Sequence, residues 1–208
     1  MIKYARQPSM ASLFNHASMA HNNHFFFSTL SNETVPIPQT LQKGLEESFS
    51  SIETLRREMI ATANAMFGPG YVWLVKTKEG KFSILSTYIA GSPYPGAHWR
   101  RQTQDMNTQS AIPDANNTSD HFRQQAIANM PIANTVGMHG QFSSNQKVAP
   151  GGVDTTPILC VNTWQHVYMP DWGVLQKKQY LEAWWDRINW NVVADAAGDK
   201  FTSSKFIR

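Results

Sequence analysis

The amino-acid sequence predicts an α+β fold, and three observations support that prediction. Apolar residues recur at helical spacing in the first third of the chain. Two runs rich in aromatic and β-branched residues, at 71–75 and 82–88, then flank a polar turn. A third run of strand length, Pro157–Asn162, precedes another amphipathic pattern near the C-terminus. Helices and strands are therefore both expected.

The N-terminal part is predicted to be helical. Bulky residues within 12–28 favour a helix, although Asn and His lower its propensity. The stretch 31–43 contains Pro36 and Pro38 and is predicted to be a connecting loop. An amphipathic helix follows and ends at a Gly-Pro-Gly stop at 68–70. Its apolar residues are Leu45, Phe49, Ile52, Leu55, Met59, Ala63 and Met66.

The predicted strands lie in the middle and late parts of the chain. Lys78-Glu79-Gly80-Lys81 is typical of a hairpin turn between the runs at 71–75 and 82–88. A core-facing helix is predicted after the strand Pro157–Asn162, because its apolar residues follow the i, i+3, i+4, i+7 pattern. Those residues are Leu181, Trp184, Trp185 and Ile188.

Residues 92–154 differ from the rest of the chain. They are rich in Asn and Gln and sustain neither the strand nor the helix period. We expect a long polar insertion, which either docks on a neighbour or stays without structure of its own.

Composition limits the class of protein. At 208 residues and 41% hydrophobic content, the chain has room for one or two globular domains. The net charge of +3 is lower than that of a dedicated nucleic-acid binder. The single Cys160 excludes an internal disulfide and fits a reducing compartment. No apolar run approaches the roughly 20 residues that span a bilayer, and we expect no secretory signal at Met1.

The pentapeptide Asn162-Thr163-Trp164-Gln165-His166 stands at the end of the third strand. Its spacing alone favours ordinary strand-end residues that form hydrogen bonds over a metal site. A second candidate site would use His21 and His24, which share a helical face, with His16. His16 does not join that face and no carboxylate is near, so a surface or packing role is favoured.

The pentapeptide, with Tyr168 and Asn189-Trp190, closely resembles the C-terminal signature of iron/manganese superoxide dismutases, where the strand ends in Asp-x-Trp-x-His. The segments 14–27, 67–75 and 86–93 resemble further motifs of that family in the same order. The resemblance implies a helical N-terminal part followed by a three-stranded antiparallel sheet flanked by helices. It divides the chain into a remnant of the helical domain at 1–43 and a dismutase-like domain at 44–208, interrupted by the insertion 92–154. The N-terminal hairpin of the family is expected to be incomplete.

The departures from the family fall on the chemistry. The resemblance places metal-ligand positions on Asn23, Asn162 and His166, of which only His166 keeps a ligand-type side chain. The two places that supply the family's glutamine fall on Met19 and Ala90. A redox metal of this class needs imidazoles and a carboxylate. We therefore expect a vestigial site with no catalytic residue, no bound metal and no cofactor.

The resemblance also concerns assembly. Family dimers pair through the segment after the ligand strand, so Gln165, His166 and Tyr168 are candidates for a dimer interface. Because Gln165 replaces a glutamate, pairing with a related but different chain is expected.

The chain looks most like the non-catalytic dismutase-like proteins of the fungal mitochondrial small ribosomal subunit. That likeness implies a structural component of that subunit, in the mitochondrial matrix and not at a membrane. Its expected partners are mitochondrial ribosomal proteins, including a second dismutase-like chain, and the ribosomal RNA backbone. One alternative is a metal-dependent superoxide dismutase with atypical ligands. Another is a dimeric module that binds a small ligand in a cleft lined by Trp73, Trp164 and Trp185.

Overall fold

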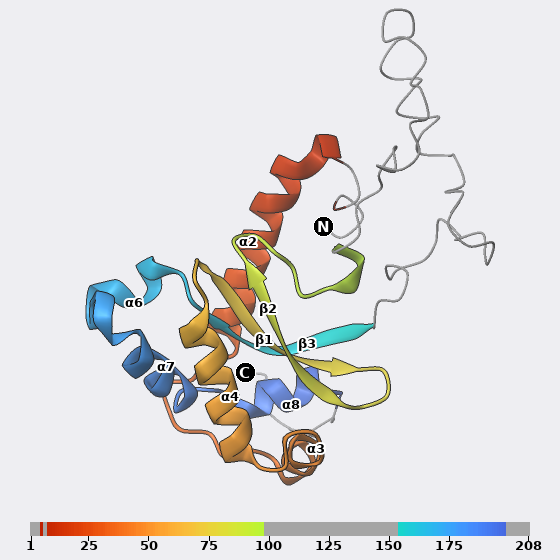
Figure 1. The fold of residues 1–208 in the computed structure, drawn as a ribbon. Coiled ribbons are helices and arrows are strands. Elements are labelled where there is room, and N and C mark those ends of the chain that lie inside the picture. Colours follow the sequence, from red (N-terminus) through yellow and green to blue (C-terminus); the bar gives the residue numbers. More distant parts are fainter. Residues whose placement is uncertain (1–4, 6–7, 98–153, 199–208) are drawn as a thin grey trace, which may run out of the picture.

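A computed structural model describes residues 5, 8–97 and 154–198, in which helices surround a small sheet (Figure 1). The elements in chain order are η1 (Pro8–Met10), α2 (Ala11–Ser28), α3 (Gln39–Phe49), α4 (Ile52–Ala65), β1 (Gly70–Thr77), β2 (Phe82–Tyr88), η2 (Pro95–Ala97), β3 (Thr155–Asn162), α6 (Gln165–Trp172), η3 (Val174–Gln176), α7 (Lys177–Trp185) and α8 (Trp190–Ala196). Among these residues no helix is both long and apolar enough to cross a membrane.

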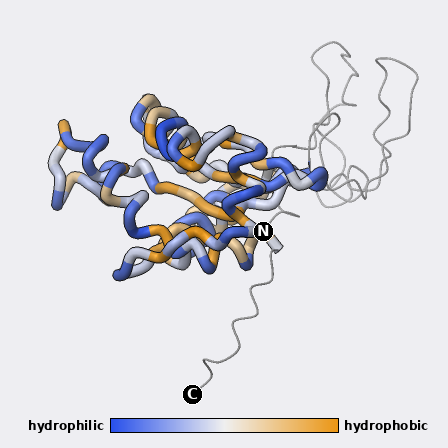
Figure 2. Tube along the Cα trace, turned by 90° about the horizontal axis from the view of Figure 1, so that it is seen from below, coloured by the Kyte–Doolittle hydropathy of each residue, from blue (hydrophilic) through white to orange (hydrophobic). Residues whose placement is uncertain are grey.

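The sheet has three antiparallel strands in the order β2-β1-β3, as the sequence predicts. β1 is the central strand because the hairpin pairs it with β2 and the later strand β3 adds to its other edge. Six consecutive residues of β1, from Gly70 to Val75, are buried. A strand covered on both faces is apolar throughout and does not alternate. Figure 2 shows the matching hydrophobic segments in the interior of the molecule.

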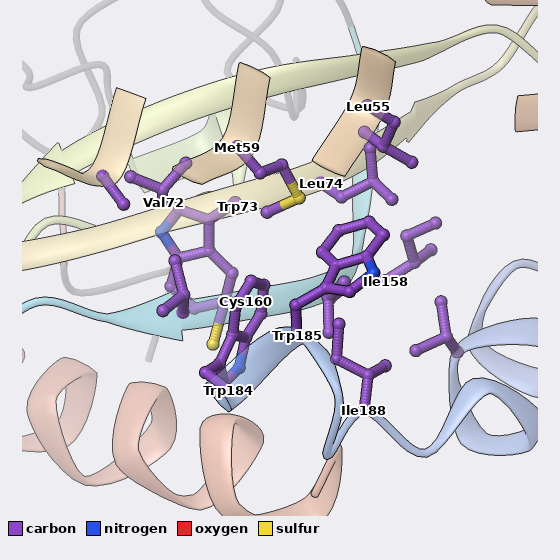
Figure 3. Close-up of a cluster of buried hydrophobic side chains, with 14 of the residues drawn as sticks. Leu55, Met59, Val72, Trp73, Leu74, Ile158, Cys160, Trp184, Trp185 and Ile188 are labelled. Carbon is purple, nitrogen blue, oxygen red and sulfur yellow. The ribbon is translucent and has the colours of Figure 1, made fainter. Parts of the chain in front are cut away.

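The two faces of the sheet carry different neighbours. Side chains of a strand alternate between faces. Val72 and Leu74 of β1 lie on the side of Leu55 and Met59 from α4, as Figure 3 shows. Trp73 lies on the other side, where its ring is 5.5 Å from that of Phe25 in α2.

The predicted amphipathic helix is in fact two helices, α3 and α4. The break lies at Ser50, which has a left-handed φ of 68°, and at Ser51, whose Oγ accepts a hydrogen bond from the Thr54 amide at 3.0 Å. A side-chain cap of this kind satisfies one of the free amides at a helix start. The loop prediction for 31–43 is wrong from Gln39 onward, because α3 begins directly after Pro38.

The C-terminal pattern is a helix followed by a turn. Trp184 and Trp185 lie in α7, but Ile188 follows that helix and pairs with Leu30 in an isolated β-bridge. That bridge joins the end of α2 to the segment between α7 and α8. Most of the expected insertion at 92–154 lies outside the described residues.

Candidate functional site between α2, β1 and β3

The inner face of α2 is unusually polar for a buried helix face. Its buried residues are Phe14, Ser18, Asn22 and Phe26, spaced four apart along one stripe. Ser18 and Asn22 are both fully buried. Half of the stripe therefore offers hydrogen-bonding groups instead of apolar surface, and this face must be held partly by polar contacts.

The register of the sheet brings a polar pair opposite this helix. Tyr71 of β1 and Asn162 of β3 are cross-strand partners, so their side chains point to the same face. The Tyr71 hydroxyl donates to Asn23 Oδ1 at 2.9 Å, and Asn162 Nδ2 donates to the same oxygen at 3.1 Å. Burial raises the pKa of Tyr71, so its phenol keeps the proton that it donates. The two asparagines that the family resemblance places at ligand positions thus bond to each other.

Asn162 is held on its other sides as well. Its Oδ1 accepts the Trp164 amide at 2.9 Å, a turn that bends the chain from β3 into α6. Its backbone carbonyl accepts the hydroxyl of Tyr180 from α7 at 2.8 Å. Burial raises the pKa of Tyr180 too, which keeps this phenol a donor. The fully buried Asn162 side chain therefore has partners for both its amide nitrogen and its oxygen.

The other predicted positions have separate surroundings. Gln165 and His166 open α6 and are exposed to solvent. The His166 ring lies 5.6 Å from the ring of Trp164. Tyr168 is buried and stacks on Tyr180 with ring centroids 5.6 Å apart. Of the three interface candidates, two are thus presented on the surface and one faces inward.

A second polar layer lies beside the asparagines on α2. Asn22 Nδ2 donates to the Gly91 carbonyl at 2.9 Å, and His21 Nε2 lies 3.2 Å from the Tyr94 hydroxyl. Burial lowers the pKa of His21. Ser18 Oγ, His21 Nδ1 and Asn22 Oδ1 are buried without a hydrogen-bond partner among the described residues. One imidazole nitrogen, one hydroxyl and one amide oxygen suit ordered water, not iron or manganese.

The donor set does not fit a redox metal. Asn23 Oδ1 already accepts two hydrogen bonds, which occupy both lone pairs of a carbonyl oxygen. Asn162 Oδ1 is engaged by the Trp164 amide. Within the described part of the chain, no three His, Cys, Asp or Glu side chains gather as a metal-binding group. His21, His24 and His16, whose grouping the sequence disfavours, form no such group, and His16 and His24 are exposed.

The sequence comparisons identify the family. The family described as iron/manganese superoxide dismutases, C-terminal domain, matches residues 37–101 and 111–196. The chain belongs to this family. The family assignment and the fold that the motifs predict are both confirmed.

Individual relatives of this dismutase-family chain fall into two groups. Small ribosomal subunit protein mS42 of Schizosaccharomyces pombe is 32% identical over 93% of the chain and 70% of its own length. Small ribosomal subunit protein mS43 of the same organism is 29% identical over 92% of the chain and 62% of its own length. Superoxide dismutase [Fe] of Escherichia coli K12 is 24% identical over 89% of the chain and 67% of its own length.

Sequence reasoning missed the hydrogen-bonding partners of the two asparagines. Tyr71 and Tyr180 were not singled out, although the strand period puts Tyr71 on the face of Trp73 and hence toward α2. The alternative of a ligand cleft lined by tryptophans is not supported by the packing. Trp73 is fully buried with its Nε1 bonded to Thr87 Oγ1, and Trp185 also belongs to the core.

Proposed function

We propose that this chain is a non-catalytic structural component of the mitochondrial small ribosomal subunit, built on a superoxide dismutase fold. The observation that carries the proposal is the pattern of similarity. Two small-subunit proteins match at 32% and 29% identity over more than nine tenths of the chain, against 24% for iron superoxide dismutases. Under this proposal the chain works in the mitochondrial matrix.

The local chemistry supports the non-catalytic half of the proposal. Superoxide dismutation needs a redox metal held by imidazoles and a carboxylate, and here two ligand positions carry amides bonded to each other. Elemental analysis of the purified chain tests this directly. We expect far less than half an equivalent of iron or manganese, and a stoichiometric amount of either would support the enzyme alternative.

Pairing with a second dismutase-like chain is part of the proposal. The two matching small-subunit proteins come from one organism, so two related chains of this family coexist there. Gln165 and His166 are exposed at the start of α6 and are available to such a partner. Tyr168 is buried and would contribute indirectly, by fixing the position of α6 through its stacking on Tyr180.

Ribosomal RNA would be contacted through scattered exposed cations. Lys78 and Lys178 are exposed, and they also pair with Asp154 and Glu182 at 2.6 and 3.8 Å. Ion pairs of this exposed kind are weak and can exchange for phosphate. With a net charge of only +3, these contacts would supplement protein contacts.

Gradient fractionation of a native mitochondrial lysate tests the assembly. We expect the chain to migrate with the small ribosomal subunit and to leave it when the subunit is dissociated. Migration as a small soluble dimer under subunit-preserving conditions would overturn the proposal. Cross-linking within the subunit fraction then identifies whether the neighbour at Gln165 and His166 is a second dismutase-like chain.

A further inference from the structure

We propose that the Asn23–Asn162 amide pair is the tie that holds α2 on the sheet without a metal, and that each asparagine depends on the other. The inference concerns the fold of the chain itself and holds whether or not the chain is ribosomal. Asn23 lies on α2 and Asn162 ends β3, 139 residues apart in sequence and 3.1 Å apart across the contact.

The first support is the complementarity of the pair. Asn162 uses its amide nitrogen toward Asn23 and its oxygen toward the Trp164 amide. Of the side chains close in shape to this one, only a neutral amide offers a donor and an acceptor in this arrangement at neutral pH. A carboxylate at this position would place a negative oxygen against Asn23 Oδ1, inside the protein and without a cation among the contacts that Asn162 makes.

The second support is the share of polar contacts in how this part of α2 is held. Its buried stripe has apolar residues at the two ends, Phe14 and Phe26, and polar ones between them. The central residues Asn22 and Asn23 instead bond to three separate segments. These are the loop after β2 through Gly91, β1 through Tyr71, and β3 through Asn162. The amide pair is the one of these contacts that joins two side chains at former ligand positions.

The third support is mutual dependence. If Asn23 loses its amide, Asn162 Nδ2 and the Tyr71 hydroxyl both lose their acceptor. Removal of one partner leaves a buried donor or acceptor unsatisfied, and this costs more stability than removal of both partners. A ligand-type residue restored at only one of the two positions therefore disrupts the contact, and the two positions must change together.

A double-mutant cycle on the full chain tests this coupling. Asn23→Ala, Asn162→Ala and the double variant are compared by urea unfolding, with Asn15→Ala on the exposed side of α2 as the control for helix propensity. We expect each single change to raise the unfolding equilibrium constant about 10-fold or more. The increase in the unfolding equilibrium constant of the double variant should be at least about threefold smaller than the product of the two single increases. A double variant within about twofold of that product would overturn the proposal. If an alanine variant cannot be recovered in soluble form, Asn23→Ser and Asn162→Ser carry the same cycle with smaller cavities.

Added metal gives an independent readout. Mn²⁺ should leave the unfolding midpoint of the unmodified chain unchanged, because the oxygens of the amide pair are already engaged. A rise in that midpoint with Mn²⁺ would overturn the proposal. Asn162→Asp and Asn23→His should each destabilise the fold alone. With EDTA present to remove metal, the combined variant should recover part of the lost stability, since an imidazole N–H can donate to a carboxylate. If the unfolding equilibrium constant of the combined variant rises by the full product of the two single effects, the mutual dependence is contradicted.

Discussion

The two faces of the sheet are held in different ways. On the α4 face, Val72 and Leu74 pack against Leu55 and Met59, and all four are fully buried and apolar (Figure 3). On the α2 face, the contact to Asn23 runs through hydroxyl and amide groups. Apolar packing is non-directional, whereas hydrogen bonds require particular atoms at particular places.

That difference sets what each face requires of its side chains. The α4 face needs only apolar side chains of suitable volume, so it does not depend on what happens at the ligand positions. On the α2 face, the two positions that the family resemblance predicts to be former ligand positions, Asn23 and Asn162, are in direct contact. The amide pair therefore belongs to an internal interface between α2 and the sheet.

Truncation on the apolar face should have the largest effect. Leu74→Ala removes a fully buried side chain from the centre of β1. We expect a loss of about 2–5 kcal/mol in unfolding free energy, from lost transfer energy and the cavity left behind. Urea denaturation measures it, with Leu175→Ala as the control because Leu175 is 96% exposed. A loss for Leu74→Ala no larger than that of the control would contradict the importance of this face.

On the polar face, Asn162→Asp should cause the next largest loss of stability, and that loss should depend on pH. We expect a loss of about 2–4 kcal/mol at pH 7, because the change removes a donor and buries a carboxylate. Burial should raise the pKa of this carboxyl above its unfolded value of about 3.9. The variant is then near normal below that pH, where a protonated carboxyl donates to Asn23, and it loses stability as the pH rises.

The groups around position 162 do not change the expected direction, in which the variant loses stability as the pH rises. The titratable groups on β3 and the adjacent elements are Tyr71 and Lys76 of β1, Cys160 of β3, His16, His21 and His24 of α2, His166, Tyr168 and Asp171 of α6, and Lys177, Lys178, Tyr180 and Glu182 of α7. Burial raises the pKa of the Cys160 thiol and of the Tyr71 and Tyr180 phenols, so these groups are neutral. Chemical denaturation from pH 4 to 8 measures the effect, with Asn15→Asp on exposed α2 surface as the control. An equal loss at pH 4 and pH 7 would show that charge burial is not the cause.

Much of the fold could be predicted, because its elements carry local signals. The ends of the helix predicted at 12–28 and of the three predicted strands agree with the structure to within two residues. The break between α3 and α4 could not be predicted from apolar spacing, which continues across it. It depends on the left-handed Ser50 and the cap at Ser51, which are properties of single residues.

The candidate site shows a sharper limit. The family motifs predict ligand positions at Asn23 and Asn162, but no sequence pattern says that these two side chains bond. The contact requires the register that pairs Tyr71 with Asn162 and the rotation of α2 that aims Asn23 at them. Both are long-range properties, and a one-residue slip in β3 would turn Asn162 to the other face. The inward position of Tyr168 likewise depends on Tyr180 in the next helix.

Removal of the phenol that supports the amide pair should have a smaller effect. Tyr71→Phe keeps the ring in place and removes only the hydrogen bond to Asn23 Oδ1. We expect a loss of about 0.5–1.5 kcal/mol, because the asparagine oxygen keeps its second donor, Asn162. Thermal or urea unfolding measures it, and Tyr88→Phe is the matched control at a tyrosine that is 52% exposed. A larger loss than that of Asn162→Asp would reverse the order of importance within this face.

The smallest expected effect concerns His21, at the edge of the polar face. Burial, with a minor contribution from His24, lowers the pKa of His21 in the folded chain. The unfolded chain therefore binds the proton first, so stability is complete above the unfolded pKa of about 6.5 and declines as the pH falls below it. Because the ring is only half-buried, the decline should stay well below the roughly 1.4 kcal/mol of a full pKa unit. His21→Phe keeps a ring beside Phe25 and Tyr94 and should flatten the stability profile between pH 5 and about 6.5. Urea midpoints across that range measure the slope of stability against pH. An unchanged slope in His21→Phe would mean that protonation of His21 does not cause the decline.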